Sequence, residues 1–176
     1  MYFKKIIGKK CYLSPIDIND VEKYTEWLND LEILRNLQLY AATISMENEK
    51  EYLNNLSKDH NYGIIDLETN ELIGNCGLMD IDFINQTAEI GIFIGNKSFW
   101  NKGYGTEAFS LLIGYGFKAL NLHNIMLKVF EYNRSAIKCY KKIGFKTIGI
   151  RREALQRDLQ KHNIVYMDIT KNEFYK

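Results

Sequence analysis

The segment from Phe99 to Thr106 (FWNKGYGT) has the residue types and spacing of an anion-binding turn. Gly103 and Gly105 stand one residue apart just before an amphipathic stretch, and glycine lets the backbone turn tightly and approach a ligand. The first N–H groups of the following helix have no acceptor inside the helix and point outward with the positive end of its dipole. The segment therefore predicts a phosphate or pyrophosphate site made of backbone, with a simple tight strand-to-helix turn as the alternative.

Two known nucleotide-binding patterns do not fit this segment. A dinucleotide-binding turn needs a third glycine at G-x-G-x-x-G spacing, but Ala108 stands there, and no acidic residue ends a following strand. A P-loop needs G-x-x-x-x-G-K-[ST], and the stretch from Gly91 to Ser98 lacks its second glycine. A phosphate site here would belong to another kind of nucleotide-containing ligand.

A second candidate region runs from Asn133 to Phe145 (NRSAIKCYKKIGF) and predicts a helix that begins at an Asn cap and stops at Gly144. Tyr140 lies on its apolar face, while Arg134 and Lys138 share another face at i,i+4 spacing. A tyrosine on an apolar face is usually packed in the core with its hydroxyl satisfied.

The elements that must position these residues alternate between strands and helices. We expect strands at Lys10–Leu13, Asn61–Asp66, Glu71–Asp80, Thr87–Ile94, Asn124–Phe130, Phe145–Arg151 and Val165–Ile169, with a polar segment of uncertain shape between the last two. We expect helices opening at Asp17, over Leu31–Leu37, after a Ser45 cap, from near Gly105 to Leu120, and over Asn133–Ile143. This order predicts a layered α/β domain with a mixed sheet.

The composition is that of one ordinary globular domain, which we expect to span residues 1–176. The 23 basic and 22 acidic side chains give a net charge of +1, so phosphate attraction of the kind used by nucleic-acid binders is not indicated. No apolar stretch approaches the roughly 20 residues of a membrane span, and residues 1–10 do not resemble a secretory signal.

The cysteines and histidines point to a cytoplasmic protein without a metal. Three cysteines are widely spaced and odd in number, as expected for reduced thiols, and no histidine has a partner at ligand spacing.

Four ordered motifs together resemble the GNAT superfamily of N-acetyltransferases, in the branch of the ribosomal-protein N-terminal and spermidine acetyltransferases. The motifs are Ala88–Ile92 on a strand, Trp100–Ala108, Asn133 seven residues before Tyr140, and Gly144–Phe145. The likeness covers roughly residues 9–170. The diphosphate signature of the family reads [Arg/Gln]-x-x-Gly-x-[Gly/Ala], and Trp100 takes its first place here, so we expect that polar side-chain contact to the cofactor to be missing.

The resemblance implies the GNAT fold: a mixed, mostly antiparallel central sheet flanked by helices, whose two central parallel strands splay apart around acetyl-CoA. An amine attacks the thioester directly, and Tyr140 is expected to face the sulfur as general acid. Cofactor contacts are expected from Ile92, from the backbone amides of Lys102, Gly103, Tyr104, Gly105 and Thr106, from Asn133 at the pantetheine, and from Arg134 and Lys138 near the nucleotide phosphates.

The attacking amine must lose a proton, and Glu89 is the candidate base. Deprotonating a lysine-like amine at pH 7 costs roughly 4–5 kcal/mol, whereas an α-amine costs about 1 kcal/mol. Strand alternation puts Glu89 and Gly91 on one face, where glycine leaves room for a substrate. The alternatives for Glu89 are an ordinary ion pair or action through water. The reserve carboxylates are Asp80, Asp82 and Glu107.

The acceptor is left open: a protein N-terminus, a polyamine, an amino acid or an aminoglycoside-like amine. A CoA-binding sensor without catalysis is the competing interpretation, and Tyr140 and Glu89 argue against it. An exposed strand near the C-terminus is compatible with a homodimer.

Overall fold

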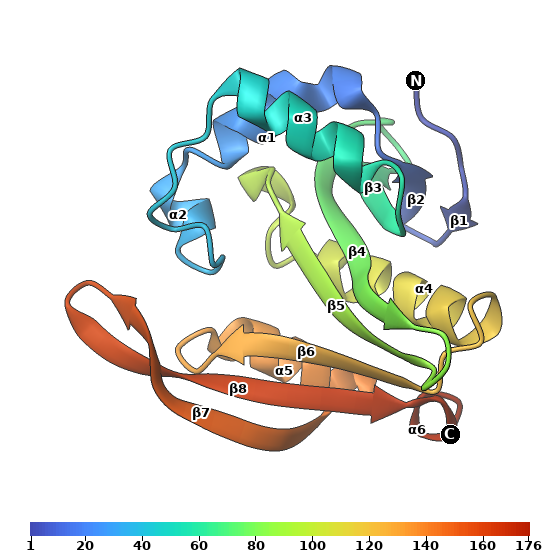
Figure 1. Ribbon diagram of the computed structural model, residues 1–176. Helices are drawn as coiled ribbons and strands as arrows, with labels where there is room; N and C mark the ends of the chain where they lie inside the picture. Colours follow the sequence, from blue (N-terminus) through green and yellow to red (C-terminus); the bar gives the residue numbers. More distant parts are fainter. The chain divides into compact units, whose positions relative to one another are not determined.

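The computed structural model describes residues 1–176 and contains a sheet of eight strands with helices between them (Figure 1). The strands are β1 (Ile6–Ile7), β2 (Cys11–Pro15), β3 (Asn61–Asp66), β4 (Leu72–Asp82), β5 (Thr87–Ile94), β6 (Asn124–Phe130), β7 (Lys146–Arg157) and β8 (Gln160–Thr170). The helices are η1 (Ile18–Asp20), α1 (Val21–Trp27), α2 (Leu31–Leu34), α3 (Met46–Leu56), η2 (Lys97–Phe99), α4 (Tyr104–Lys118), α5 (Arg134–Ile143) and α6 (Lys171–Phe174). None of them is both long enough and apolar enough to cross a bilayer.

The strand order in the sheet is β1-β2-β3-β4-β5-β6-β8-β7. The pair β5–β6 is parallel, whereas β1–β2, β2–β3, β3–β4, β6–β8 and β7–β8 are antiparallel. The expected α/β architecture with a mixed, mostly antiparallel sheet is therefore confirmed. The chain divides into two compact units, the first made of Met1–Gly77 and Ile92–Leu112, and the second of Leu78–Gly91 and Ile113–Lys176.

In the first unit the helices α1 and α3 pack side by side (Figure 1), and both contribute residues to an apolar cluster. The buried members of this cluster are Tyr12, Ile16, Tyr24, Trp27, Ile33, Leu53, Ile65 and Leu72. Both helix starts follow the predicted caps. The Asp17 side chain accepts from the Asn19 N–H at η1, and the Ser45 side chain accepts from the Asn48 N–H at α3.

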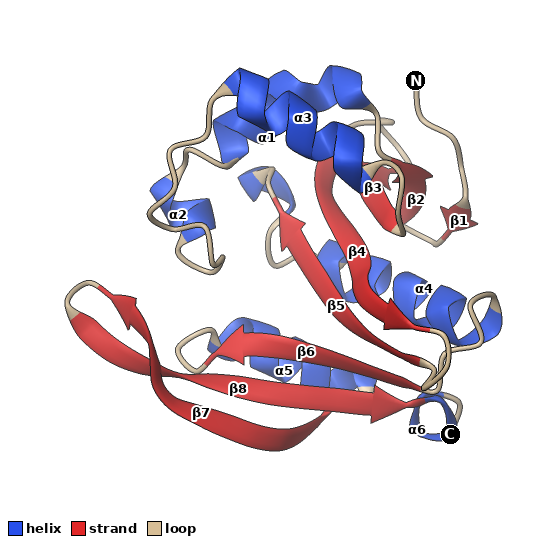
Figure 2. Cartoon of the chain, in the orientation of Figure 1, coloured by secondary structure: helices blue, strands red, loops and turns tan.

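The second unit contains the long antiparallel hairpin of β7 and β8, drawn as two long red strands in Figure 2. The polar segment between Arg151 and Val165, whose shape the sequence left open, is part of this hairpin. The turn of the hairpin is made by Asp158 and Leu159, both with positive φ. Irregularities between Thr147 and Gly149 and between Arg151 and Leu155 interrupt the β7 register. These bulges break the strand's alternation, which explains why the sequence did not predict its full length.

The hydrogen-bonded part of the parallel pair β5–β6 belongs to the second unit. The two strands share three residue pairs, the last of which joins Glu89 to Met126. No pair follows at Ile90 or Gly91, so the strands separate after Glu89. The shared ladder ends where the expected splay of the central parallel strands would begin.

Candidate functional site

The turn before α4 has the backbone geometry of an anion site. Gly103 has a φ of 87°, in the left-handed region that favours glycine, and Asn101 has a φ of 59°. The first hydrogen bond of the helix runs from the Glu107 N–H to the Gly103 carbonyl at 3.1 Å. The Tyr104 and Gly105 amides therefore lie in the first turn of a 15-residue helix, at the positive end of its dipole. This arrangement fits a phosphate or pyrophosphate group.

The indole N–H of Trp100, the one hydrogen-bond donor of this side chain, is used inside the protein and not on such a ligand. Its Nε1 donates to the Ile94 carbonyl at 2.8 Å, and its ring packs against the apolar cluster of the first unit. The Lys97 ammonium lies over the ring, 5.9 Å from its centroid. Trp100 thus ties the end of β5 to the turn.

Tyr104 anchors the start of α4. Its hydroxyl donates to Asp66 Oδ1 at 2.7 Å, and this hydrogen bond raises the pKa of Tyr104 to about 12. Burial acts to raise the pKa of Asp66, but hydrogen bonds from Thr69 and Tyr104 hold that pKa below its ordinary value. A buried, ionised carboxylate with several donors therefore fixes the ring of Tyr104 beside the turn.

Two of the three reserve carboxylates, Glu107 and Asp82, accept hydrogen bonds from backbone N–H groups. Glu107 Oε1 accepts the backbone N–H groups of Lys9 at 2.6 Å and Lys10 at 2.8 Å, so it fastens the turn before β2 to the first turn of α4. Asp82 accepts the N–H groups of Ile84 and Asn85, and the bond from Asn85 is the main cause that lowers its pKa.

Glu89 lies on β5 in the second unit and forms an ion pair with Lys128 of β6. The distance from Lys128 Nζ to Glu89 Oε2 is 2.7 Å, and the side chain of Lys128 is 32% exposed and that of Glu89 18%. The hydrogen bond to Glu89 raises the pKa of Lys128. The space expected beside Gly91 is partly filled, because a Cβ added there would lie 3.1 Å from the Met79 methyl carbon.

Helix α5, also in the second unit, begins and ends as predicted. The Asn133 side chain accepts from the Ala136 N–H at 3.1 Å, and Gly144 closes the helix with a φ of 120°. Tyr140 packs near Phe145, with 6.0 Å between ring centroids. Burial raises the pKa of Tyr140 above its usual range, so its hydroxyl gives up a proton less readily than that of an ordinary tyrosine.

The remaining predicted cofactor residues are distributed over both units. Arg134 and Lys138 are exposed on α5 in the second unit. Ile92 is half-buried on β5 in the first unit, together with the turn that contains Lys102 and Thr106. No group of three or more His, Cys, Asp or Glu side chains is placed to hold a metal ion.

Two lysines that the sequence analysis did not single out, Lys128 and Lys10, contact predicted site residues. Lys128 pairs with Glu89, and a register for the parallel strands would have revealed it. Lys10 donates from Nζ to the Lys102 carbonyl at 2.8 Å, and no local pattern connects two residues so far apart in the sequence.

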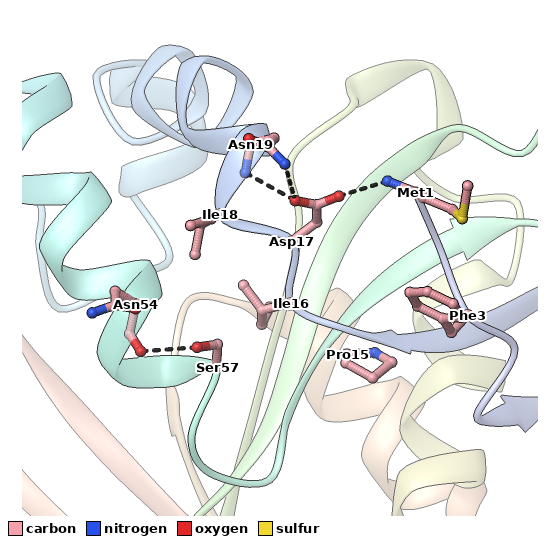
Figure 3. Close-up of a pocket in the computed structure, with 9 residues that line it drawn as sticks. All are labelled: Met1, Phe3, Pro15, Ile16, Asp17, Ile18, Asn19, Asn54 and Ser57. Atoms are coloured by element: carbon pink, nitrogen blue, oxygen red, sulfur yellow. Dashed lines mark hydrogen bonds and ion pairs between the residues drawn. The ribbon is translucent and has the colours of Figure 1, made fainter.

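Two pockets have none of the predicted site residues in their lining. One, of about 440 Å³ in the first unit, is lined by Met1, Phe3, Pro15, Ile16, Asp17, Ile18, Asn19, Asn54 and Ser57 (Figure 3). Its carboxylate is already paired, since the Met1 ammonium lies 2.6 Å from Asp17 (Figure 3). The other, of about 720 Å³ in the second unit, is lined by Arg152, Glu153 and Asn163 of the β7–β8 hairpin.

Comparisons with known proteins agree with the likeness in the motifs. The sequence model of the family described as Acetyltransferase (GNAT) domain matches residues 10–146. An uncharacterized N-acetyltransferase, p20, of Bacillus licheniformis is 33% identical over 80% of this chain and 82% of its own length. The α/β-tubulin N-acetyltransferase 9 of Mus musculus is 26% identical over 82% of this chain and 65% of its own length.

Solved structures share the fold. The crystal structure of spermidine N-acetyltransferase from Vibrio cholerae, in complex with CoA and spermine, has a TM-score of 0.86 at 22% identity, covering 96% of this chain and 100% of that one. An acetyltransferase of the same family from Bacillus anthracis has a TM-score of 0.84 at 23% identity, covering 98% of this chain and 100% of that one.

Proposed function

The chain belongs to the GNAT acetyltransferase family and is an acyltransferase that uses acetyl-CoA, and we propose that it transfers the acetyl group to a primary amine by direct attack in a ternary complex. We also propose that residues 1–176 act as one N-acetyltransferase domain. The observation that carries the proposal is the glycine turn with its positive φ at Gly103, followed directly by the long helix α4.

The chain's own residues provide a place for the donor. Acetyl-CoA supplies an activated acetyl thioester together with a pyrophosphate that can be gripped by backbone. The amides from Lys102 to Thr106 hold that pyrophosphate, and Asn133 contacts the pantetheine. Arg134 and Lys138 screen the nucleotide phosphates, and Ile92 contacts the cofactor from β5.

Tyr140 supports the departing sulfur. Because its pKa is raised, the hydroxyl stays protonated throughout the physiological range. An ordinary thiol has a pKa of about 8.5, so full proton transfer from this tyrosine to a thiolate is uphill. Tyr140 therefore acts as general acid mainly by donating a hydrogen bond to the sulfur as negative charge develops there.

Glu89 removes the proton of the amine, directly or through water. Its carboxylate lies 2.7 Å from the Lys128 ammonium. An α-amine costs about 1 kcal/mol to deprotonate at pH 7, whereas a lysine-like amine costs roughly 4–5 kcal/mol, so an α-amine needs the least help from a base. We therefore place a peptide or protein N-terminus first among the acceptors.

Names of related proteins support this class of acceptor and one other. The mouse relative is named as a tubulin N-acetyltransferase, and tubulin would be a protein acceptor. The structure from Vibrio cholerae contains spermine, so a polyamine is the second candidate.

An amine panel tests the proposal. The protein is mixed with acetyl-CoA and either a peptide with a free α-amine, the same peptide with that amine blocked and one lysine present, spermidine, or a free amino acid, and thiol release is followed. Thiol release with the first peptide and not with its blocked form supports an N-terminal acceptor. Release with spermidine alone selects the polyamine. CoA binding without thiol release for any amine would favour a CoA-binding sensor.

A further inference from the structure

The turn before α4 lacks the polar side chain that the family signature places at its first position. Trp100 stands there, with its Nε1 bonded to the Ile94 carbonyl and its ring against the apolar cluster. The turn itself then offers a pyrophosphate only backbone amides. A charge-assisted hydrogen bond from a cationic side chain would strengthen the binding of a phosphate there.

A cation from a distant part of the sequence lies at this turn. The Lys10 Nζ donates to the Lys102 carbonyl at 2.8 Å and lies 5.7 Å from the centroid of the Tyr104 ring. Apart from the chain neighbours of Gly103, it is also the only atom within 4 Å of the place where a Cβ on Gly103 would stand, at 3.8 Å. The ammonium is therefore beside the residue whose conformation opens the turn.

The backbone of Lys10 is fixed from both sides. Its N–H donates to Glu107 Oε1 at 2.8 Å, and its carbonyl accepts from the Leu67 N–H at 2.9 Å. A Cβ at Gly8 would collide with the same Glu107 carboxylate, so this turn needs glycine to approach α4. The backbone from which the Lys10 side chain extends is thus held by the residue after β3, by α4 and by the preceding turn.

We propose that Lys10 binds the pyrophosphate of coenzyme A and supplies the cationic donor that Trp100 cannot provide. An ammonium has three donors, of which one is used on the Lys102 carbonyl, so two remain for phosphate oxygens. The hydrogen bonds of Glu107 Oε1 go to the backbone N–H groups of Lys9 and Lys10, whereas the Lys10 ammonium donates to the Lys102 carbonyl. The inference rests on the proposed function.

Calorimetric titration of Lys10→Met tests the assignment, with Lys9→Met as matched control. Lys9 is the exposed neighbour whose N–H is bonded to the same carboxylate, so its variant removes the same charge from the same turn. The ligands are CoA, dephospho-CoA, which keeps the pyrophosphate but lacks the 3′-phosphate, and pantetheine, which has no phosphate. Thermal unfolding confirms that both variants fold.

The expected result is that Lys10→Met weakens CoA and dephospho-CoA by the same factor, about three- to thirtyfold at low salt, and leaves pantetheine unchanged. The effect shrinks at high ionic strength, since an exposed charge is screened. Lys9→Met binds all three ligands as the unaltered protein does. Equal affinity of Lys10→Met and the unaltered protein for CoA, or a weakening for CoA that is absent for dephospho-CoA, overturns the assignment. An unaltered protein that does not bind CoA overturns the proposed function itself.

Discussion

Lys128 Nζ lies 2.7 Å from Oε2 of Glu89, the last residue of β5 that is paired with β6. Lys128 stands two residues after Met126, the partner of Glu89 in the register, so its side chain reaches back to the carboxylate. The carboxylate at the point of strand separation thus has a fixed cationic partner. Two variants distinguish a carboxylate that acts as a base from one that serves only in an ion pair.

Glu89→Gln removes the proton acceptor, and Lys128→Met removes the partner while the carboxylate remains. If Glu89 acts as base, Glu89→Gln lowers turnover by about 10²- to 10⁴-fold and Lys128→Met retains most of it. The measurement is the rate of thiol release across pH. Equal decreases in the two variants contradict the base and leave the ion pair as the role of Glu89, and recovery of Glu89→Gln at high pH indicates that simple proton removal is the missing step.

Tyr140→Phe keeps the ring that packs near Phe145 and removes only the hydroxyl. We expect turnover to fall by about ten- to a thousandfold, because the leaving sulfur loses its hydrogen-bond donor, while acetyl-CoA still binds. Thiol release gives the rate and calorimetry the affinity. Unchanged turnover would remove Tyr140 from the acid role.

Gly103→Val should weaken CoA binding and lower stability together. With a φ of 87°, Gly103 lies where a β-branched residue is strained by about 1–3 kcal/mol. Gly149→Val is the control, since Gly149 has no positive φ and nothing lies within 4 Å of an added Cβ. CoA affinity and the midpoint of thermal unfolding are measured for both. A Gly103→Val protein with unaltered titration heat would contradict the phosphate turn.

Glu49→Gln should stabilise the protein above neutral pH. Glu49 is 3% exposed, its Oε1 has no hydrogen-bond partner, and burial raises its pKa from 4.5 to about 7. The folded state therefore binds this proton more tightly than the unfolded state, so stability falls as pH rises from about 4.5 to about 7 and stays lower above that range.

The glutamine variant lacks this penalty, and we expect it to be more stable than the unaltered protein by about 1–3 kcal/mol at pH 8. The two proteins should converge at pH 4, where the glutamate is protonated in both states. Urea unfolding at the two pH values measures the difference. A constant difference across pH would show that ionisation of Glu49 is not its cause.

Most elements could be predicted where the sequence has a clear period and a marked boundary. The strand Thr87–Ile94 was predicted with the bounds that the structure has, because apolar residues alternate between turn residues. The caps at Asp17 and Ser45 were predicted for the same local reason. The full length of β7 was not, since the strand is largely exposed and twice bulged, and the two-residue β1 has no period at all.

The site was predictable only as far as its motifs are local. The glycine turn and the cap at Asn133 follow from neighbouring residues, and the structure has both. The contacts of Lys10 with Lys102 and of Lys128 with Glu89 depend on which strands and turns become neighbours. The contacts of Glu107 were not predictable either. Its residue type suits a base, whereas in the structure its carboxylate accepts hydrogen bonds from the turn before β2 and so links that turn to α4.

The two outer strands of the sheet have a consequence for the behaviour of the protein at high concentration. An uncovered strand is a template for adding further strands from other molecules, which leads to fibres. Here β1 has only two residues, and β7 interrupts its ladder twice and exposes Arg151 and Arg152. An approaching chain would meet a broken row of donors and acceptors and a like charge, so open-ended growth of the sheet is hindered at both borders.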